Sequence, residues 1–296
     1  MGSGMRVALI GAGGLAHRFA VRAQEAGLAV VAFGPLATAP WPAGISHTAY
    51  SNRDELAVVL AEHRPDVVVV FGPRSGDRQS APPVVAVEAT AAAVDARLIY
   101  WGSATVYGCA VDVRGDALLE NAPLSNRSAA AAAVAADRAV QDLAATRPDR
   151  VHLFRASESL VGDSTDPAEV VGQLRIVPAT GDRRHLQLLD LRDALEILDR
   201  AVRGEHAGTY NVSADGIMRV DEACRALGRT AARLPRLLHL AAAYLAQWTG
   251  KVNSARLLLR FTAGTPIVDN TRLKTHFGFR PRFTTRQALA AAREGR

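Results

Sequence analysis

A glycine-rich segment near the start of the chain has the residue types and spacing of a phosphate-binding loop. In VALIGAGGLAHRFA, residues 7–20, Gly11, Gly13 and Ala16 form a G-x-G-x-x-A pattern that follows an apolar run and opens a helical one. The first glycine allows a tight turn, the second lets backbone N–H groups approach a pyrophosphate, and the alanine keeps the helix close to the sheet. The pattern predicts a dinucleotide site, with a glycine-rich turn that binds no cofactor as the alternative.

The predicted second strand indicates which dinucleotide this loop prefers. Sites for NAD usually have Asp or Glu at the end of this strand, but here the chain continues as AFGPLATAP, residues 32–40, without an acid. The Arg18 guanidinium could pair with a 2′-phosphate, as could Arg53 or Arg74, although a solvated arginine is the plainer interpretation of Arg18. We therefore expect NADP to be preferred and NAD to be possible. The residues expected to contact the cofactor are Gly11, Gly13, Gly14, Leu15, Ala16, His17, Arg18, Gly34, Phe71, Gly72, Pro73, Ser103 and Ser157.

Short apolar runs separated by helical stretches predict the fold that positions the loop. Strands that are buried on both faces show continuous apolar runs instead of alternation, and helices between them indicate a parallel sheet. The N-terminal half is therefore predicted to be an α/β domain with a doubly wound parallel sheet, the Rossmann arrangement. The predicted strands are 6–11, 28–33, 66–72, 97–102 and 151–157, and the predicted helices are about 15–26, 53–63, 82–94 and 124–141.

The pattern becomes less regular after residue 157, and this predicts a second, smaller region. We expect a dinucleotide-binding domain over 5–157, to which parts of about 184–213 return, with a strand at 184–189 and a helix at 191–203. A substrate-binding cap is expected to comprise 158–183 and 214–296. Residues 1–4 are expected to be the remnant of an expression tag.

Composition and charge exclude several classes of function. The chain has 296 residues, 49% of them apolar, and its net charge of +6 comes from 35 basic residues of which only Lys251 and Lys274 are lysines. The arginines are scattered among acidic residues, so no nucleic-acid partner is expected. Cys109 and Cys224 are far apart and have no metal-ligand spacing, which predicts neither a metal site nor a disulfide and suits a reducing cytoplasm.

One other apolar segment, LLHLAAAYLAQW at 237–248, is too short to span a bilayer and is flanked by Arg236 and Lys251. We expect a buried or lid helix there and no membrane partner. With Tyr244 and Trp248, the stretch 230–265 is expected to provide lid walls, as is 158–175.

A wider set of segments resembles the extended short-chain dehydrogenase/reductases of the epimerase/dehydratase type, in particular their atypical branch. The resemblance extends over nearly the whole chain in the correct order. It is carried by the glycine loop and by PDVVVV, RLIYWGSATVYG, VHLFRASESLVGD, LQLLDLRDAL, GTYNVSADG and FGFRPRFTTRQAL.

The resemblance assigns catalytic roles, and the chain departs from them at two positions. In this family the serine that matches Ser103 binds the substrate oxygen, while a Tyr-x-x-x-Lys pair on the next helix performs the proton transfer. Alignment through Asp137–Ala139 puts Ala129 at the tyrosine position and Ala133 at the lysine position. No shift of register restores the pair, since no lysine precedes Lys251. The tyrosines are Tyr50, Tyr100, Tyr107, Tyr210 and Tyr244.

A ketone reduction without this pair needs another source for its proton. Ser103 and Thr105 are placed by the resemblance to orient the carbonyl, but an unassisted hydroxyl is a poor acid. Ser125, Asn126 and Ser128 could hold a water, although capping the next helix is the more ordinary role. A hydroxyl of the substrate beside its ketone is the better donor, because the protein then supplies proximity and orientation.

In lacking this pair, the chain resembles the angucyclinone ketoreductases of antibiotic biosynthesis. This resemblance implies an NADPH-dependent reduction of an aromatic polyketide at its C-7 ketone. The alternatives are an NADP-sensing regulator without turnover and, less compatible with the missing tyrosine, a nucleotide-sugar epimerase or dehydratase. Other cap residues have plain interpretations: His185 is expected at the surface or in the core, Tyr210 in the core, and Asp193 as a structural acid in the first turn of a helix.

Overall fold

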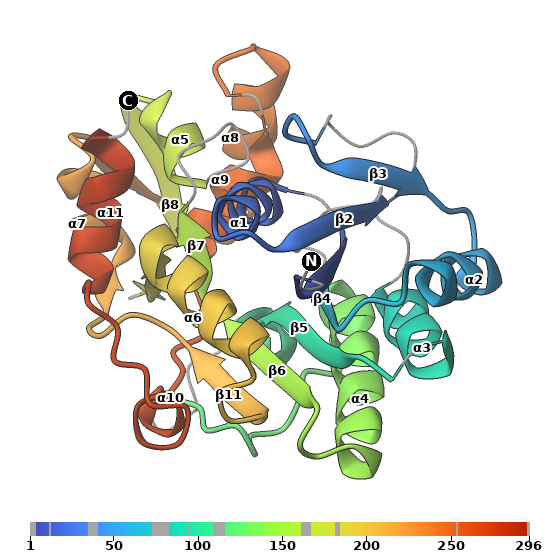
Figure 1. Cartoon of the computed structure of the whole chain (residues 1–296). Coiled ribbons are helices and arrows are strands. Elements are labelled where there is room, and N and C mark those ends of the chain that lie inside the picture. The colour runs from blue at the N-terminus through green and yellow to red at the C-terminus, as the bar shows by residue number, and fades with distance from the viewer. Residues whose placement is uncertain are drawn as a thin grey trace.

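A seven-stranded sheet in which every pair of neighbouring strands is parallel forms the centre of the protein (Figure 1). Its strands are β1 (Arg6–Ile10), β2 (Ala29–Gly34), β3 (Ser46–Ala49), β4 (Val67–Phe71), β5 (Arg97–Ser103), β6 (Val151–Ala156) and β11 (Gly208–Val212). They lie in the order β11-β6-β5-β4-β1-β2-β3, which confirms the predicted doubly wound α/β class. The computed structural model describes residues 4–11, 13–34, 41–72, 83–93, 95–108, 116–160, 167–180, 184–252 and 254–294.

Helices cover both faces of this sheet. One face packs against α1 (Gly14–Glu25) and α6 (Leu191–Arg203), and the other packs against α2 (Arg53–His63), α3 (Pro83–Ala93) and α4 (Ala131–Thr146) (Figure 1). The central strand β4 is apolar at all of its positions because both of its faces are buried, as its sequence VVVVF indicates.

The remaining elements form a smaller region with its own apolar core beside the carboxyl ends of β5 and β6. The predicted strand at 184–189 is two short strands that belong to this region, so only α6 and β11 return to the large sheet. Its elements are β7 (Glu158–Leu160), α5 (Pro167–Gly172), β8 (Ile176–Thr180), β9 (His185–Leu186), β10 (Leu188–Asp190), β12 (Met218–Arg219), α7 (Val220–Ala226), β13 (Thr230–Leu234), α8 (Arg236–Trp248), α9 (Ala255–Ala263), α10 (Thr271–Thr275) and α11 (Thr285–Glu294).

Helix α8 differs from its prediction as a buried or lid helix. Only His239, Ala243 and Ala246 on it are buried, whereas Tyr244 and Trp248 are exposed. The buried residues lie on one side of the helix, and the apolar side chains on its other side remain at the surface. Across the described ranges, no helix is long and apolar enough to cross a membrane.

Acid is expected to destabilise the protein through His152, which is fully buried on β6. Burial lowers the pKa of its imidazole from 6.5 to about 4, and a hydrogen bond between Nε2 and the Glu205 carbonyl only partly offsets this. The unfolded chain takes up this proton first as the pH falls. With respect to His152, the free energy of unfolding is therefore at its full value above about pH 6.5 and falls between about pH 6.5 and pH 4.

Within that window we expect the free energy of unfolding to fall by up to about 1.4 kcal/mol per pH unit because of this group. Urea denaturation at several pH values measures the slope. The His152→Gln variant should have a shallower slope, and an unchanged slope would show that His152 is not its source.

Candidate functional site

The carboxyl ends of the parallel strands bring the predicted cofactor residues to one edge of the sheet. Gly11 follows β1, Gly34 ends β2, Phe71 ends β4 and Ser103 ends β5. The strand order reverses between β1 and β4, since β2 lies on the other side of β1. In open α/β sheets a crevice forms at this point of reversal, and ligands bind there.

The two glycines of the loop have different structural tasks. Gly11 has a φ of 107°, and a Cβ there would lie 2.8 Å from the Phe71 carbonyl oxygen, so this glycine lets β1 approach β4 closely. Gly13 has a φ of 129° and precedes α1, and a Cβ there would meet nothing within 4 Å. No side chain in the described part of the chain caps the first turn of α1, and this turn contains no acidic residue. Its N–H groups therefore face a space that suits an anion such as a pyrophosphate.

An aspartate at position 13 is expected to weaken dinucleotide binding by about 100-fold or more, because it places a negative charge where the pyrophosphate would lie. The matched control is Gly228→Asp, since Gly228 also has a positive φ, 72°, and open space around its Cβ position. Fluorescence titration with NADPH measures affinity, and thermal unfolding measures the cost of backbone strain. Equal affinities of the two variants would contradict a cofactor role for Gly13.

The other predicted cofactor residues occupy varied environments. Leu15 and Ala16 are buried in α1 and hold the helix on the sheet, whereas Arg18 is exposed. His17 packs edge-on against Trp41, with the ring centroids 4.6 Å apart. The first residue of α1 is Gly14. Pro73 and Arg74 lie outside the described residues.

Two predicted positions near β5 are tightly enclosed. A Cβ on Gly72 would lie 2.7 Å from the Tyr100 hydroxyl oxygen, so only glycine fits there. Ser157 follows β6 and is buried, and its Oγ has no hydrogen-bond partner in the described part of the chain. A buried hydroxyl without a partner is uncommon, and this one lies at the sheet edge where a cofactor is predicted.

The Ser103 hydroxyl is held by Thr105. Its Oγ accepts a hydrogen bond from the Thr105 backbone N–H at 3.2 Å and lies 2.9 Å from the Thr105 hydroxyl. When Thr105 is the donor in the second contact, the Ser103 proton has no acceptor among the described residues and is available for a ligand. The predicted pair Ser103 and Thr105 is thus brought together at the carboxyl end of β5.

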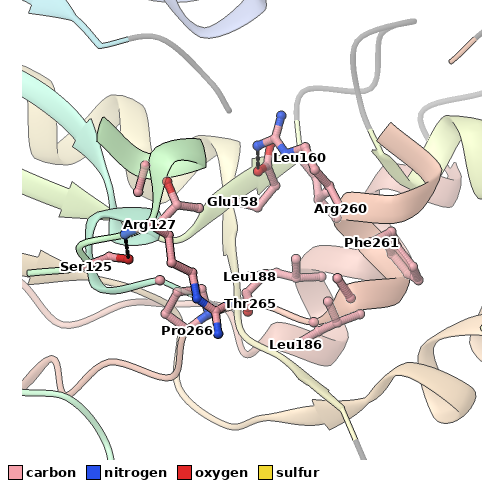
Figure 2. A pocket seen from close by; sticks show the side chains of 15 residues that line it. Ser125, Arg127, Glu158, Leu160, Leu186, Leu188, Arg260, Phe261, Thr265 and Pro266 are labelled. Atoms are coloured by element: carbon pink, nitrogen blue, oxygen red, sulfur yellow. Dashed lines mark hydrogen bonds and ion pairs between the residues drawn. The ribbon is translucent and has the colours of Figure 1, made fainter. Parts of the chain in front are cut away.

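Thr105 also lines a pocket that encloses about 820 Å³, including its open mouth (Figure 2). Three leucines and Phe261 make much of its wall, and most of the surface that lines it is apolar although six of the lining residues have polar side chains, which is the usual character of a small-molecule site. The lining residues are Thr105, Gly108, Ser125, Arg127, Ala130, Glu158, Leu160, Leu186, Leu188, Arg260, Phe261, Ala263, Gly264, Thr265 and Pro266.

Two arginines enter this pocket with different partners. Arg260 forms an ion pair with Glu158, and both side chains are largely buried. Arg127 is exposed and extends toward Thr265 and Pro266 (Figure 2). The lining of the pocket therefore contains one ion pair, Arg260 with Glu158, and one solvent-exposed arginine, Arg127.

The alanine-rich helix supplies no acid to this pocket. Ala133 lies on α4 against a cluster that contains Tyr107 and Val268, and Ala130 lines the pocket. Ala129 lies in the 3-10 turn before α4, and its side chain is outside the described residues. This register agrees with the predicted absence of the Tyr-x-x-x-Lys pair.

None of the five tyrosines of the chain lines the pocket, although all of them lie in the described ranges. Tyr50, Tyr100, Tyr107 and Tyr210 are buried, and burial raises the pKa of each. The two lysines lie elsewhere as well, with Lys274 paired to Asp215 at 2.6 Å. No tyrosine or lysine of this chain is therefore placed to protonate a ligand in this pocket.

Several other predicted residues have structural positions. Tyr210 packs in the core, as predicted, and donates to the His206 carbonyl at 2.9 Å. Asp193 is a buried structural acid that accepts from the N–H groups of Arg282 and Phe283. His185 does not line the pocket, whereas its neighbour Leu186 does.

The predicted caps of α4 are wrong. Among the described residues no side chain caps this helix, and the Ser125 Oγ instead accepts the N–H of Arg127 at 3.2 Å. Neither Asn126 nor Ser128 lines the pocket, and neither do Tyr244 and Trp248, which were predicted as lid walls. The sequence reasoning also missed Arg127, Glu158 and Arg260, because charged residues far apart in the chain carry no local signal of a shared site.

The sequence was compared with protein families and with individual proteins. No protein-family model matches the chain. An uncharacterised protein of Mycobacterium tuberculosis is 30% identical over 154 residues, which is 51% of this chain and only 40% of that relative. A matching uncharacterised protein of Mycobacterium bovis has the same identity and coverage.

Solved structures match over the whole length. UDP-glucose 4-epimerase from Thermotoga maritima superposes with a TM-score of 0.73 at 13% identity, covering 98% of both chains. The dTDP-glucose 4,6-dehydratase from Bacillus anthracis, solved with NAD, has a TM-score of 0.70 at 15% identity and covers 98% of this chain and 96% of its own. The chain therefore shares the fold of these epimerase and dehydratase structures.

Proposed function

We propose that the protein is an NADPH-dependent ketoreductase that reduces a ketone of an aromatic polyketide, the C-7 ketone of an angucyclinone-like molecule, in antibiotic biosynthesis. The observation that carries this proposal is the free donor of Ser103, next to an apolar pocket whose lining contains neither tyrosine nor lysine. A flat polycyclic ligand would suit such a wall. Ser103 itself does not line the pocket, but it is hydrogen-bonded to Thr105, which does, so its hydroxyl would meet a carbonyl oxygen placed at that end of the pocket.

The residues present fit a nicotinamide dinucleotide. The uncapped N-terminus of α1 and the open space at Gly13 suit its pyrophosphate, and the unpartnered Ser157 Oγ lies at the same sheet edge. The preference for NADP rests on Arg18, because Arg53 is already engaged with Glu88 at 3.7 Å. Arg18 is the fifth residue of α1, and an exposed guanidinium there suits a 2′-phosphate.

The chain contributes orientation and hydrogen bonding to the reaction. A bound nicotinamide cofactor supplies the hydride. The Ser103 hydroxyl donates a hydrogen bond to the ketone oxygen, and Thr105 holds the Ser103 oxygen by two hydrogen bonds. A hydroxyl of the substrate next to its ketone donates the proton as the alkoxide forms. Positioning alone can supply several kcal/mol of the barrier reduction.

The pocket favours this reaction over chemistry on a nucleotide sugar. A diphosphate needs several free cations, but Arg260 is neutralised by Glu158, which leaves Arg127 as the other arginine in the lining. The family resemblance also assigns epimerase chemistry to the tyrosine that this chain replaces by Ala129.

Incubation with NADPH and a panel of aromatic hydroxyketones tests the proposal, with the nicotinamide absorbance as readout. We expect NADPH oxidation and an alcohol product with at least one ketone that has an adjacent hydroxyl. Tight NADPH binding without oxidation across the panel would instead indicate an NADP-sensing regulator, and no NADPH binding would reject both functions.

A further inference from the structure

Helix α8 exposes an apolar face that no described part of the chain covers. Six of the eleven large apolar side chains that are exposed in the described ranges lie on this one helix. The buried residues His239, Ala243 and Ala246 form a narrow stripe on the opposite side. The exposed residues are Leu237, Leu238, Leu240, Tyr244, Leu245 and Trp248.

The spacing of these residues makes the face continuous. Leu237, Tyr244 and Trp248 are separated by seven and four positions, so they lie in one line along the helix. Trp248 is 85% exposed and Leu237 is 79% exposed, which leaves almost the whole of each side chain in water. Large apolar patches of this kind on soluble domains commonly mark a contact site.

The surrounding charge indicates the chemistry of the partner. Between Glu222 and Asp269 the sequence contains seven basic residues and no acidic one, although Arg225, Arg233 and Arg260 form ion pairs with acidic residues outside this stretch. Arg236 begins α8 and Lys251 follows its end, and both are exposed. An apolar helix face with cations at both ends is complementary to a partner that has an apolar layer beneath a layer of negatively charged groups.

We propose that α8 docks the protein onto an anionic lipid bilayer, which replaces the sequence-based expectation of no membrane partner because most of its large apolar side chains are exposed. Leucines with a tryptophan and a tyrosine, flanked by basic residues, are the composition of helices that lie in the membrane interface. The packing of Ala243 and Ala246 against the cap holds α8 folded before it meets lipid, so the apolar face is presented ready to insert.

A second copy of the chain is a weaker partner for this face. A helix of 13 residues is about 20 Å long, and its one exposed side is small against the roughly 800 Å² per partner of a stable interface. Pairing through α8 would also bring the cations of two identical segments together, with no acid from either segment to balance them.

Flotation of the full chain with vesicles tests the proposal. Vesicles of phosphatidylcholine with phosphatidylglycerol are expected to bind the protein about tenfold or more tightly than vesicles of phosphatidylcholine alone. The Trp248 emission is expected to shift to shorter wavelength on binding, because Trp101 is buried and Trp41 is partly buried already.

Paired variants distinguish vesicle binding through α8 from non-specific binding by other exposed apolar side chains. Leu237→Ser combined with Trp248→Ser should reduce vesicle binding about tenfold or more, whereas Ile217→Ser should not, although Ile217 is itself 51% exposed. Replacing Arg236 and Lys251 by glutamine should remove much of the preference for anionic lipid.

Three results would overturn the proposal. These are no binding to either vesicle, equal binding to both, and a concentration-dependent dimer in sedimentation that the Leu237→Ser and Trp248→Ser changes dissociate. The last would identify α8 as a self-interface. NADPH oxidation by the same variants is a separate readout, so loss of docking and failure of the ketoreductase proposal are distinguishable.

Discussion

Replacing Ser103 with alanine is expected to lower kcat for ketone reduction by about 100- to 1,000-fold, the usual effect of removing one donor to a developing oxyanion. The effect should be large because the described pocket offers no tyrosine or lysine that could take over. Steady-state kinetics measures kcat, and NADPH titration should give an affinity close to that of the unaltered protein.

Thr105→Val is the matched comparison. It removes the hydroxyl that donates to the Ser103 Oγ at 2.9 Å but leaves the Ser103 proton in place. We expect a smaller loss of kcat, about tenfold, because the orientation of Ser103 is weakened and its donor is kept. A Ser103→Ala variant with unchanged kcat and normal stability would remove Ser103 from the reaction.

Replacing Asp137 with asparagine is expected to lower the free energy of unfolding by about 3–5 kcal/mol, because it leaves a buried guanidinium without its counter-charge. Arg155 on β6 holds the Asp137 carboxylate through two hydrogen bonds, at 2.7 and 2.8 Å, and the two side chains are 2% and 1% exposed. Burial lowers the pKa of Arg155, but the hydrogen bonds and charges of Asp137 and Tyr107 together more than offset this, so the net shift is upward.

This ion pair belongs to a larger buried network. Arg155 also donates to the Tyr107 hydroxyl at 2.7 Å, and Tyr107 donates to Asn211 at 2.8 Å. The network therefore joins α4, β6 and β11 behind the turn that follows Ser103, and its loss should disturb that turn as well.

The matched control for this prediction is Asp95→Asn, which breaks the exposed pair between Asp95 and Arg150. Exposed pairs contribute about 0–1 kcal/mol, so this variant should be nearly as stable as the unaltered protein. Urea denaturation compares the two. If Asp137→Asn costs no more than Asp95→Asn, the buried pair is not a major source of stability.

The sheet could be predicted from sequence because its signals are local. A strand such as β4, with the run VVVVF, shows burial on both faces, and the glycine loop marks the end of β1. Strand β3, SHTA, was missed because an edge strand that is partly exposed has neither a continuous apolar run nor a strong turn signal.

The candidate site was predicted only where it lies on the sheet edge. Ser103, Thr105 and the glycines follow predicted strands, so their neighbourhood could be anticipated. The pocket wall comes instead from β7, β9, β10 and α9, which meet through tertiary packing of short elements. The exposure of α8 could not be predicted either, since an apolar helix normally packs with its apolar face inward.

The alignment of the alanine-rich helix could be predicted from the sequence. The residues Asp137–Ala139 fixed the alignment, and the structure gives a physical reason for the acid, which is the buried pair with Arg155. The same alignment placed alanines at the positions of the family's acid and lysine, and none of the tyrosines lines the pocket.

Single-turnover kinetics with NADPH can compare an aromatic hydroxyketone with its methyl ether. Blocking the neighbouring hydroxyl is expected to slow hydride transfer by about 100- to 10,000-fold, the contribution of a positioned proton donor, while both ketones bind. Equal rates for the two ketones would show that the proton comes from the protein or from water and not from the substrate.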